Sequence, residues 1–282
     1  MSRLFVEHLC VIDCAWLHPE RGLLGESWIV DIELEGGLDE QGMVLDFGRV
    51  KPLLKSLIDE SVDHRLLVPG RDPALRLDID GGEAKLRYRY GDAELLHRSP
   101  LTALCVLDRG DITASAVEAH LGELCLAAMP SNVTGMTIGL RAETIAGPSY
   151  RYVHGLPKHD GNCQRIAHGH RSRIEIFRDG LRCEASERWL AERWRDIYLG
   201  SRGDLVTNDG ETAPRCYHFR YTAPEGEFEL VIERERCELL ETESTVEQIA
   251  AHVARLLKER EPGATFRVRA YEGVKKGAIA DV

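Results

Sequence analysis

The feature that most constrains the fold of this 282-residue chain is an internal repeat of its secondary-structure pattern. In the first half, the pattern predicts strands at 4–11 and 28–35, a helix at 50–60, a charged hairpin at 75–90, a helix at 113–128 and a strand at 136–143. In the second half, it predicts strands at 150–154 and 171–177, a helix at 187–198, a hairpin at 217–234, a helix at 245–260 and a strand at 266–272. The shared order predicts an α+β protein built from two similar domains.

Local signals support the repeat and place its boundary. Thr113 and Thr245 each stand directly before an apolar-periodic run, where a hydroxyl caps the start of a helix. Glycine and proline interrupt the pattern at residues 146–149. We therefore expect one domain at 1–147 and a second at 148–282.

The second half carries a pattern that is typical of a zinc site. His168 and His170 lie two residues apart at the start of a predicted strand, so their side chains project to the same face. His154 ends the preceding predicted strand and can supply a third imidazole, while Cys163 lies between the two strands. Three ligands leave a position open for a substrate, as in catalytic zinc sites, whereas Cys163 as a fourth ligand would close a structural site. The spacing alone leaves both alternatives open.

The two halves differ where this chemistry lies. The first half has Leu24-Gly25-Glu26 in place of His-Gly-His, so in the sequence only His8 remains of a three-histidine set, and we expect no zinc there. That half instead carries Asp63-His64 after its first helix, which the second half lacks. An Asp-His pair in isolation is more typical of a solvated turn than of a catalytic pair.

Composition excludes several classes of partner. A formal net charge of -11 without a basic run argues against nucleic acid and anionic membranes as partners. The N-terminus lacks a secretory apolar segment, and no stretch has the roughly 20 apolar residues of a membrane span. Eight cysteines without a CxxC pair fit a reducing compartment. We therefore expect a cytoplasmic protein.

These motifs resemble the 6-pyruvoyltetrahydropterin synthase and 6-carboxytetrahydropterin synthase family. The family's histidine, catalytic cysteine and His-Gly-His match His154, Cys163, His168 and His170, and its Asp-His pair matches Asp63-His64. Its Gly-Met-hydrophobic-x-Asp-Phe stretch matches residues 42–47. Its pterin-anchoring glutamate matches Glu272, with Glu143 as the first-half counterpart.

The resemblance implies two tandem tunnelling-fold domains of ββααββ order, with antiparallel sheets and helices on one face. It implies one site per chain, in which the zinc ligands and Cys163 come from one half and Asp63-His64 from the other. Cys163 would be the general base, His64 oriented by Asp63 would move a second proton, and Zn²⁺ would act as a Lewis acid.

The implied substrate is the pterin dihydroneopterin triphosphate, converted to 6-carboxytetrahydropterin on the route to queuosine and other 7-deazaguanines. A 6-pyruvoyl product, or a non-catalytic pterin-binding or structural zinc protein, are the alternatives. The implied assembly is a homo-oligomer, with a trimer forming a pseudo-hexamer favoured. The sequence assigns no role to the two charged hairpins.

Overall fold

The computed structural model describes residues 2–206 and 215–282. Within these residues the α-helices are α1 (Phe47–Ser61), α2 (Ala114–Ala127), α3 (Glu184–Arg193) and α4 (Val246–Arg260). The strands of the first half are β1 (Ser2–His18), β2 (Gly22–Gly36), β3 (Leu66–Pro69), β4 (Leu75–Asp80), β5 (Glu83–Tyr90), β6 (Ala93–Pro100), β7 (Leu104–Leu107) and β8 (Val133–Ala142). Those of the second half are β9 (Ser149–His154), β10 (His168–Arg178), β11 (Leu181–Arg182), β12 (Ile197–Ser201), β13 (Cys216–Ala223), β14 (Gly226–Glu233), β15 (Cys237–Leu240), β16 (Phe266–Tyr271) and β17 (Gly277–Asp281).

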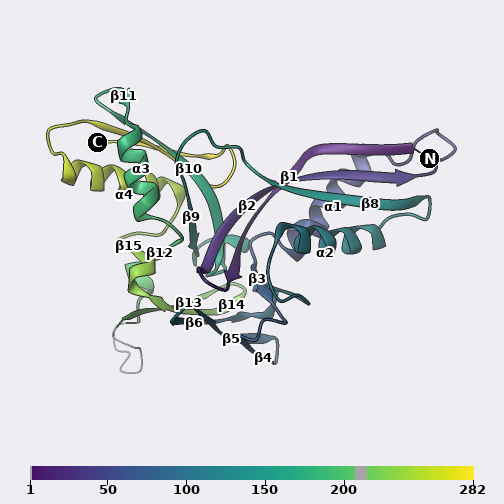
Figure 1. The fold of residues 1–282 in the computed structure, drawn as a ribbon, viewed down its shortest axis with the longest axis horizontal. Coiled ribbons are helices and arrows are strands. Elements are labelled where there is room, and N and C mark those ends of the chain that lie inside the picture. Colours follow the sequence, from purple (N-terminus) through teal and green to yellow (C-terminus); the bar gives the residue numbers. More distant parts are fainter. Residues whose placement is uncertain (1, 207–214) are drawn as a thin grey trace.

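The two halves repeat one sheet topology (Figure 1). The first sheet has the order β7-β3-β1-β2-β8, and the second has β15-β12-β9-β10-β16, followed by β17. The predicted α+β tunnelling-fold class is confirmed, with antiparallel pairs at the centre of each sheet. The sequence did not predict the parallel strands β3, β7, β12 and β15 that extend the two sheets. The predicted helix at 187–198 was too long, because α3 ends at Arg193 and β12 begins at Ile197.

Each pair of helices packs on its own sheet. The buried faces of α1 and α2 share a core with β1 and β2, and those of α3 and α4 share a core with β9, β10 and β16. Thr113 and Thr245 accept hydrogen bonds from backbone N–H groups in the first turns of α2 and α4, as expected for helix caps. None of the helices in the described parts of the chain is long and apolar enough to cross a membrane. The division at residues 147 and 148 stays a prediction.

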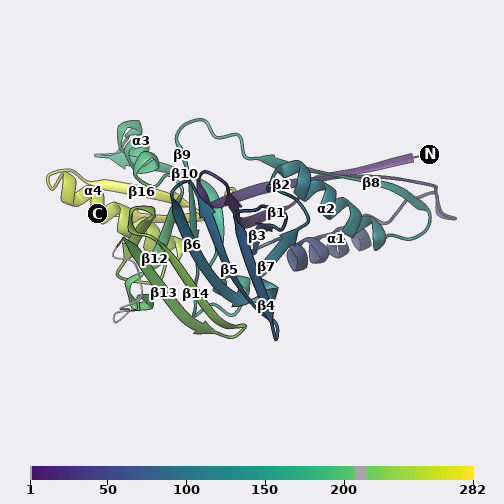
Figure 2. The same ribbon diagram turned by 60° about the horizontal axis from the view of Figure 1, so that its bottom comes forward.

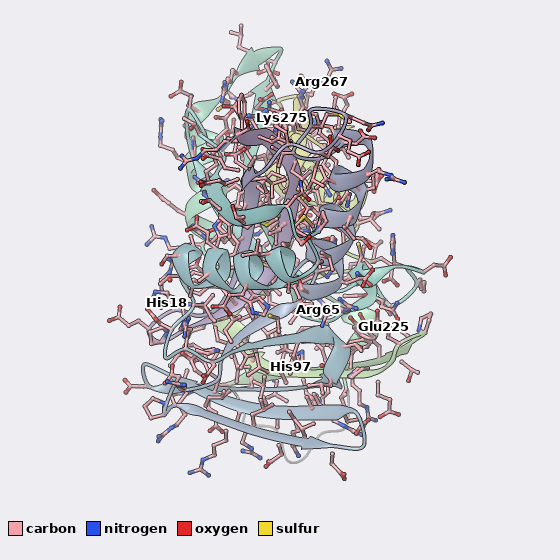
Figure 3. The ribbon with its side chains drawn as sticks, turned by 90° about the vertical axis from the view of Figure 1, so that its right-hand side faces the viewer. His18, Arg65, His97, Glu225, Arg267 and Lys275 are labelled. Carbon is pink, nitrogen blue, oxygen red and sulfur yellow. The ribbon has the colours of Figure 1, made fainter. Side chains whose placement is uncertain are left out.

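A third sheet joins the two halves (Figure 2). Its order is β13-β14-β6-β5-β4, so the two charged hairpins of the sequence meet where β14 pairs with β6. Tyr88 from the first half and Phe228 from the second are fully buried beneath it, in a core that both halves share. Figure 3 shows this sheet on one side of the molecule, with His97 on β6. The hairpins therefore hold the halves together.

The halves also meet directly, at two glycines in equivalent positions. Gly25 of β2 and Gly169 of β10 approach so closely that a Cβ on Gly169 would lie 2.7 Å from Gly25 Cα. A Cβ on Gly25 would lie 2.1 Å from the carbonyl oxygen of Tyr152. Equivalent residues that touch each other indicate a pseudo-twofold relation between the halves.

Gly25→Ala is expected to lower the free energy of unfolding by about 1–3 kcal/mol, because overpacking forces the two backbones apart. Gly139→Ala, on β8, is the matched control, since its new Cβ would meet no atom nearer than 3.9 Å. Urea unfolding of both variants measures the effect. Equal stability of both variants would contradict the close approach.

Candidate metal and catalytic site

Strand pairing gathers the three predicted zinc histidines. His154 lies directly opposite His168 in the β9–β10 pair, and His170 follows two residues later on the same face. All three are at most 1% exposed. One ligand atom from each lies within 4.8 Å of the other two. The predicted constellation of imidazoles is therefore present within one half of the chain.

Hydrogen bonds orient two of these rings. His154 Nδ1 donates to Ser244 O at 3.0 Å, and His168 Nδ1 donates to Arg165 O at 2.9 Å. A carbonyl oxygen only accepts, so in each neutral ring the Nε2 atom keeps its lone pair. Burial and the neighbouring histidines lower the pKa of both groups well below the usual value, which favours the neutral form.

The Nε2 atoms of His154 and His168 both keep lone pairs, and His170 Nε2 lies close to that of His154. His154 Nε2 lies 3.2 Å from His170 Nε2, and His168 Nε2 is buried without a hydrogen-bond partner among the described residues. Opposed lone pairs in a buried site repel unless a cation lies between them. This donor set fits a metal ion with nitrogen ligands.

The third ring is oriented by a residue that sequence reasoning missed. His170 Nδ1 lies 3.1 Å from Asp13 Oδ1, which comes from β1 in the other half. Ser27 Oγ donates to the same oxygen at 2.5 Å, and Lys276 Nζ lies 3.4 Å from Asp13 Oδ2. Burial would raise the pKa of Asp13, but His170 and Lys276 hold it below its usual range. A charged residue within the apolar run of residues 10–15 was the available signal.

Asp13→Asn is expected to weaken zinc affinity about 10- to 100-fold, because a carboxylate beside a ligating histidine fixes its tautomer and raises its basicity. Asp31→Asn on β2 is the control, since Asp31 pairs with Arg141. Competition with a chromogenic chelator gives both affinities. Wild-type affinity in Asp13→Asn would exclude this role.

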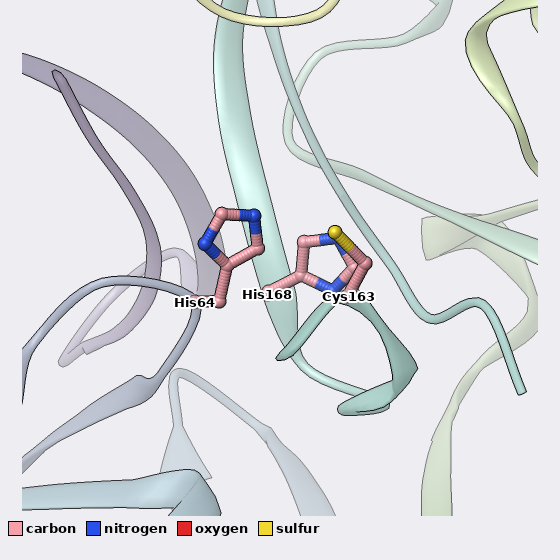
Figure 4. A group of neighbouring side chains, drawn as sticks. All are labelled: His64, Cys163 and His168. Carbon is pink, nitrogen blue, oxygen red and sulfur yellow. The ribbon is translucent and has the colours of Figure 1, made fainter. Parts of the chain in front are cut away.

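The predicted Asp63-His64 pair of the first half reaches the second half within the same chain. Figure 4 shows the His64 ring beside Cys163 and His168. One ligand atom from each of these three residues lies within 4.8 Å of the other two. The His64 and His168 ring centroids are 5.2 Å apart. The halves therefore complete one cluster without a second chain.

Backbone geometry fixes His64. Its ring Nδ1 lies 2.6 Å from Asp63 Oδ2, and Asp63 Oδ1 accepts from the backbone N–H of Asp13 at 2.8 Å. His64 has a φ of 53°, and its own N–H donates to Asp13 O. Burial alone would lower the pKa of His64, but Asp63 and Cys163 raise it to about 10. Asp63 thus acts as the orienting partner of His64.

The pairing registers correct the comparison of the two halves. The equivalent glycines Gly25 and Gly169 pair with Ala15 and Val153, so Ala15 and Val153 are equivalent. The next residue along each strand then shows that Trp16 occupies the position of His154. The assignment of His8 as the remaining histidine was wrong, because His8 lies at an irregularity of β1 with a φ of 54°. The first half therefore has Trp16, Leu24 and Glu26 where the second has its three histidines.

The two predicted glutamates lie in different surroundings. Glu272 Oε2 lies 3.5 Å from Lys276 Nζ, and through Lys276 it connects to Asp13 beside His170. Glu143 is 8% exposed and its Oε1 lies 3.0 Å from Arg173 Nη1. The strand registers place Ala142, not Glu143, at the position equivalent to Glu272. Pterin binding by either glutamate stays a prediction.

Comparison with known proteins finds similarity over part of the chain. The family model for 6-pyruvoyl tetrahydropterin synthase matches residues 8–102, which include Asp63-His64. Over these residues the chain is similar to the 6-pyruvoyl tetrahydropterin synthase family. The match ends before the three clustered histidines of the second half.

Curated relatives and solved structures are similar over part of the chain. A putative 6-carboxy-5,6,7,8-tetrahydropterin synthase from Pyrococcus abyssi is 27% identical over 40% of this chain and 64% of its own length. A 6-carboxy-5,6,7,8-tetrahydropterin synthase from Rickettsia bellii is 34% identical over 27% of this chain and 51% of its own length. The chain thus spans less than two thirds of these relatives. The structure of 6-pyruvoyl tetrahydropterin synthase from Plasmodium vivax is 17% identical, with a TM-score of 0.42, and covers 51% of this chain and 93% of that one.

Proposed function

We propose that this protein is a zinc-dependent 6-carboxytetrahydropterin synthase that acts on dihydroneopterin triphosphate, with one active site per chain. The observation that carries the proposal is the meeting of His64 with Cys163 and His168 across the two halves of one chain. A structural zinc site, even one closed by Cys163, gives no reason for an oriented Asp-His pair. The names of the curated relatives support the carboxy-forming branch.

The side chains divide the chemistry between them. Cys163 accepts a proton from the substrate side chain as a thiolate, and His64 moves a second proton while Asp63 fixes its ring. Glu272 holds the guanidine-like edge of the pterin by charge-assisted hydrogen bonds. His154, His168 and His170 would hold zinc, which supplies Lewis-acid polarisation of the substrate's side-chain oxygens when bound.

Turnover of dihydroneopterin triphosphate by zinc-loaded protein, with the product identified by mass spectrometry, tests the proposal. A 6-carboxy product is expected, which would place the enzyme on the route to queuosine and other 7-deazaguanines. A 6-pyruvoyl product would keep the active site but change the branch. Zinc binding without turnover would point to a binding or structural role.

We also propose a cytoplasmic homotrimer that forms a pseudo-hexamer of six domains. β8 and β17 are edge strands of their sheets among the described residues, and exposed edges favour pairing with another chain. Size-exclusion chromatography with light scattering is expected to give the mass of three chains. A monomer would rule out the assembly while leaving the within-chain site intact.

A further inference from the structure

The pseudo-twofold relation gives the active site a counterpart on the other side of the Gly25–Gly169 crossing. Val153 and Ala15 are equivalent residues, and they pair with Tyr198 and Leu66, so these two are equivalent as well. Two residues before them along the chain, Asp196 therefore occupies the position of His64. The two residues share the same left-handed backbone, with φ values of 55° and 53°. Arg195 accordingly takes the place of Asp63.

Residues at equivalent positions are also in contact with one another at both sites. Asp13 lies beside His170, and the equivalent pair, Arg151 and Glu26, forms an ion pair with an Nη2–Oε2 distance of 2.9 Å. Arg21, in the turn between β1 and β2, donates from Nε and Nη2 to both Asp196 oxygens. The side chains of the counterpart therefore differ from those of the active site, although the backbone positions are equivalent.

Three residues of the counterpart, Arg151, Arg195 and Asp196, line a cavity of about 300 Å³, which we call the image site. Its lining includes four arginines, Arg21, Arg151, Arg188 and Arg195. Asp196 and Glu192 are the acidic residues in its lining, so arginines outnumber carboxylates there, although Glu26 and Glu184 outside the lining pair with Arg151 and Arg188. This excess is unusual in a chain with a formal net charge of -11. Such a concave basic site attracts anions.

Two arginines of the image site retain unused donors. Arg151 Nε is buried without a hydrogen-bond partner among the described residues, although Nη2 binds Glu26. Arg195 is exposed and forms no ion pair within the described part of the chain. Guanidinium groups match the oxygen geometry of phosphates and carboxylates, and several together favour a multiply charged anion.

We propose that the image site binds a small phosphate-type anion. The ligand would lie between the two halves, contacting Arg195 and Arg188 from the second half and Arg21 from the first. The inference concerns binding alone and does not depend on the activity proposed above.

Isothermal titration with inorganic pyrophosphate at constant ionic strength tests the proposal. We expect one pyrophosphate per chain, with affinity at least about tenfold weaker in the variant that combines Arg195→Gln and Arg188→Gln, because charge-assisted hydrogen bonds are lost. Both side chains are exposed, so the variant should fold normally, which circular dichroism checks.

Arg76→Gln is the matched control, an exposed arginine on β4 of the joining sheet. It should bind pyrophosphate with wild-type affinity. Absence of pyrophosphate binding to the wild type would overturn the proposal. Binding that is equal in the wild type and the double variant would also overturn it, because the anion would then lie elsewhere, for example in the active site.

Discussion

His64→Ala is expected to lower kcat with dihydroneopterin triphosphate by about 10²- to 10⁴-fold, the usual contribution of a positioned acid or base. His64 is not among the three histidines that gather at the metal site, so zinc affinity should change little. Cys163→Ala is expected to have a loss of similar size. His120→Ala, on α2, is the control that should retain activity.

Co-expression of the two inactive variants separates a site within the chain from a site between chains. Because His64 and Cys163 meet in one chain, a mixed oligomer of His64→Ala and Cys163→Ala chains should stay inactive. If His64 served Cys163 of a neighbouring chain, some sites in the mixture would be complete. Recovered activity in the mixed oligomer would therefore contradict the within-chain site.

His170→Ala is expected to remove zinc from the protein at equilibrium with a moderate chelator. Zinc sites with several protein ligands bind with roughly 10–16 kcal/mol, so losing one ligand of three should cost affinity about 10³-fold or more. The variant should stay folded, because none of the three histidines belongs to the apolar cores under the two sheets, and among the described core residues only Tyr152 makes a ring contact with His170. Metal analysis after dialysis measures the loss.

His8→Ala is the matched control for the zinc experiment. Comparison of the two half-sequences placed a zinc ligand at His8, but in the strand register His8 does not occupy that position. Zinc content should equal that of the wild type. Loss of zinc in His8→Ala would mean that the register of β1 differs from the one described.

The sequence predicted the elements whose signals are local. His168 and His170 share a face because side chains alternate in a strand, and the helix caps at Thr113 and Thr245 follow from residue type. The short parallel strands were not predictable, because four or five residues are too few for a periodic signal and their partners lie 38 to 51 residues away. The β6–β14 pairing was not predictable either, because its partners are more than a hundred residues apart.

The same contrast between local signals and contacts of distant segments explains which site residues could be predicted from the sequence. The candidate zinc ligands of the site lie within 17 residues of sequence, from His154 to His170, whereas Asp13 reaches them only through the packing of β1 on β10. His8 misled because β1 continues well past it: Trp16, eight residues further along, pairs with Leu24, whereas His8 lies between Val6 opposite Ile32 and Cys10 opposite Val30. The position equivalent to His154 could be found only from the strand pairing.

The Gly25–Gly169 crossing has an evolutionary consequence. In a symmetric dimer of identical chains, every substitution near the axis occurs twice, so a change that benefits one site alters its twin. Here the two sides of the axis are encoded separately, and Asp13 beside His170 coexists with Arg151 beside Glu26. Fusion thus frees each side to mutate alone, and selection can act on one ligand without altering the other.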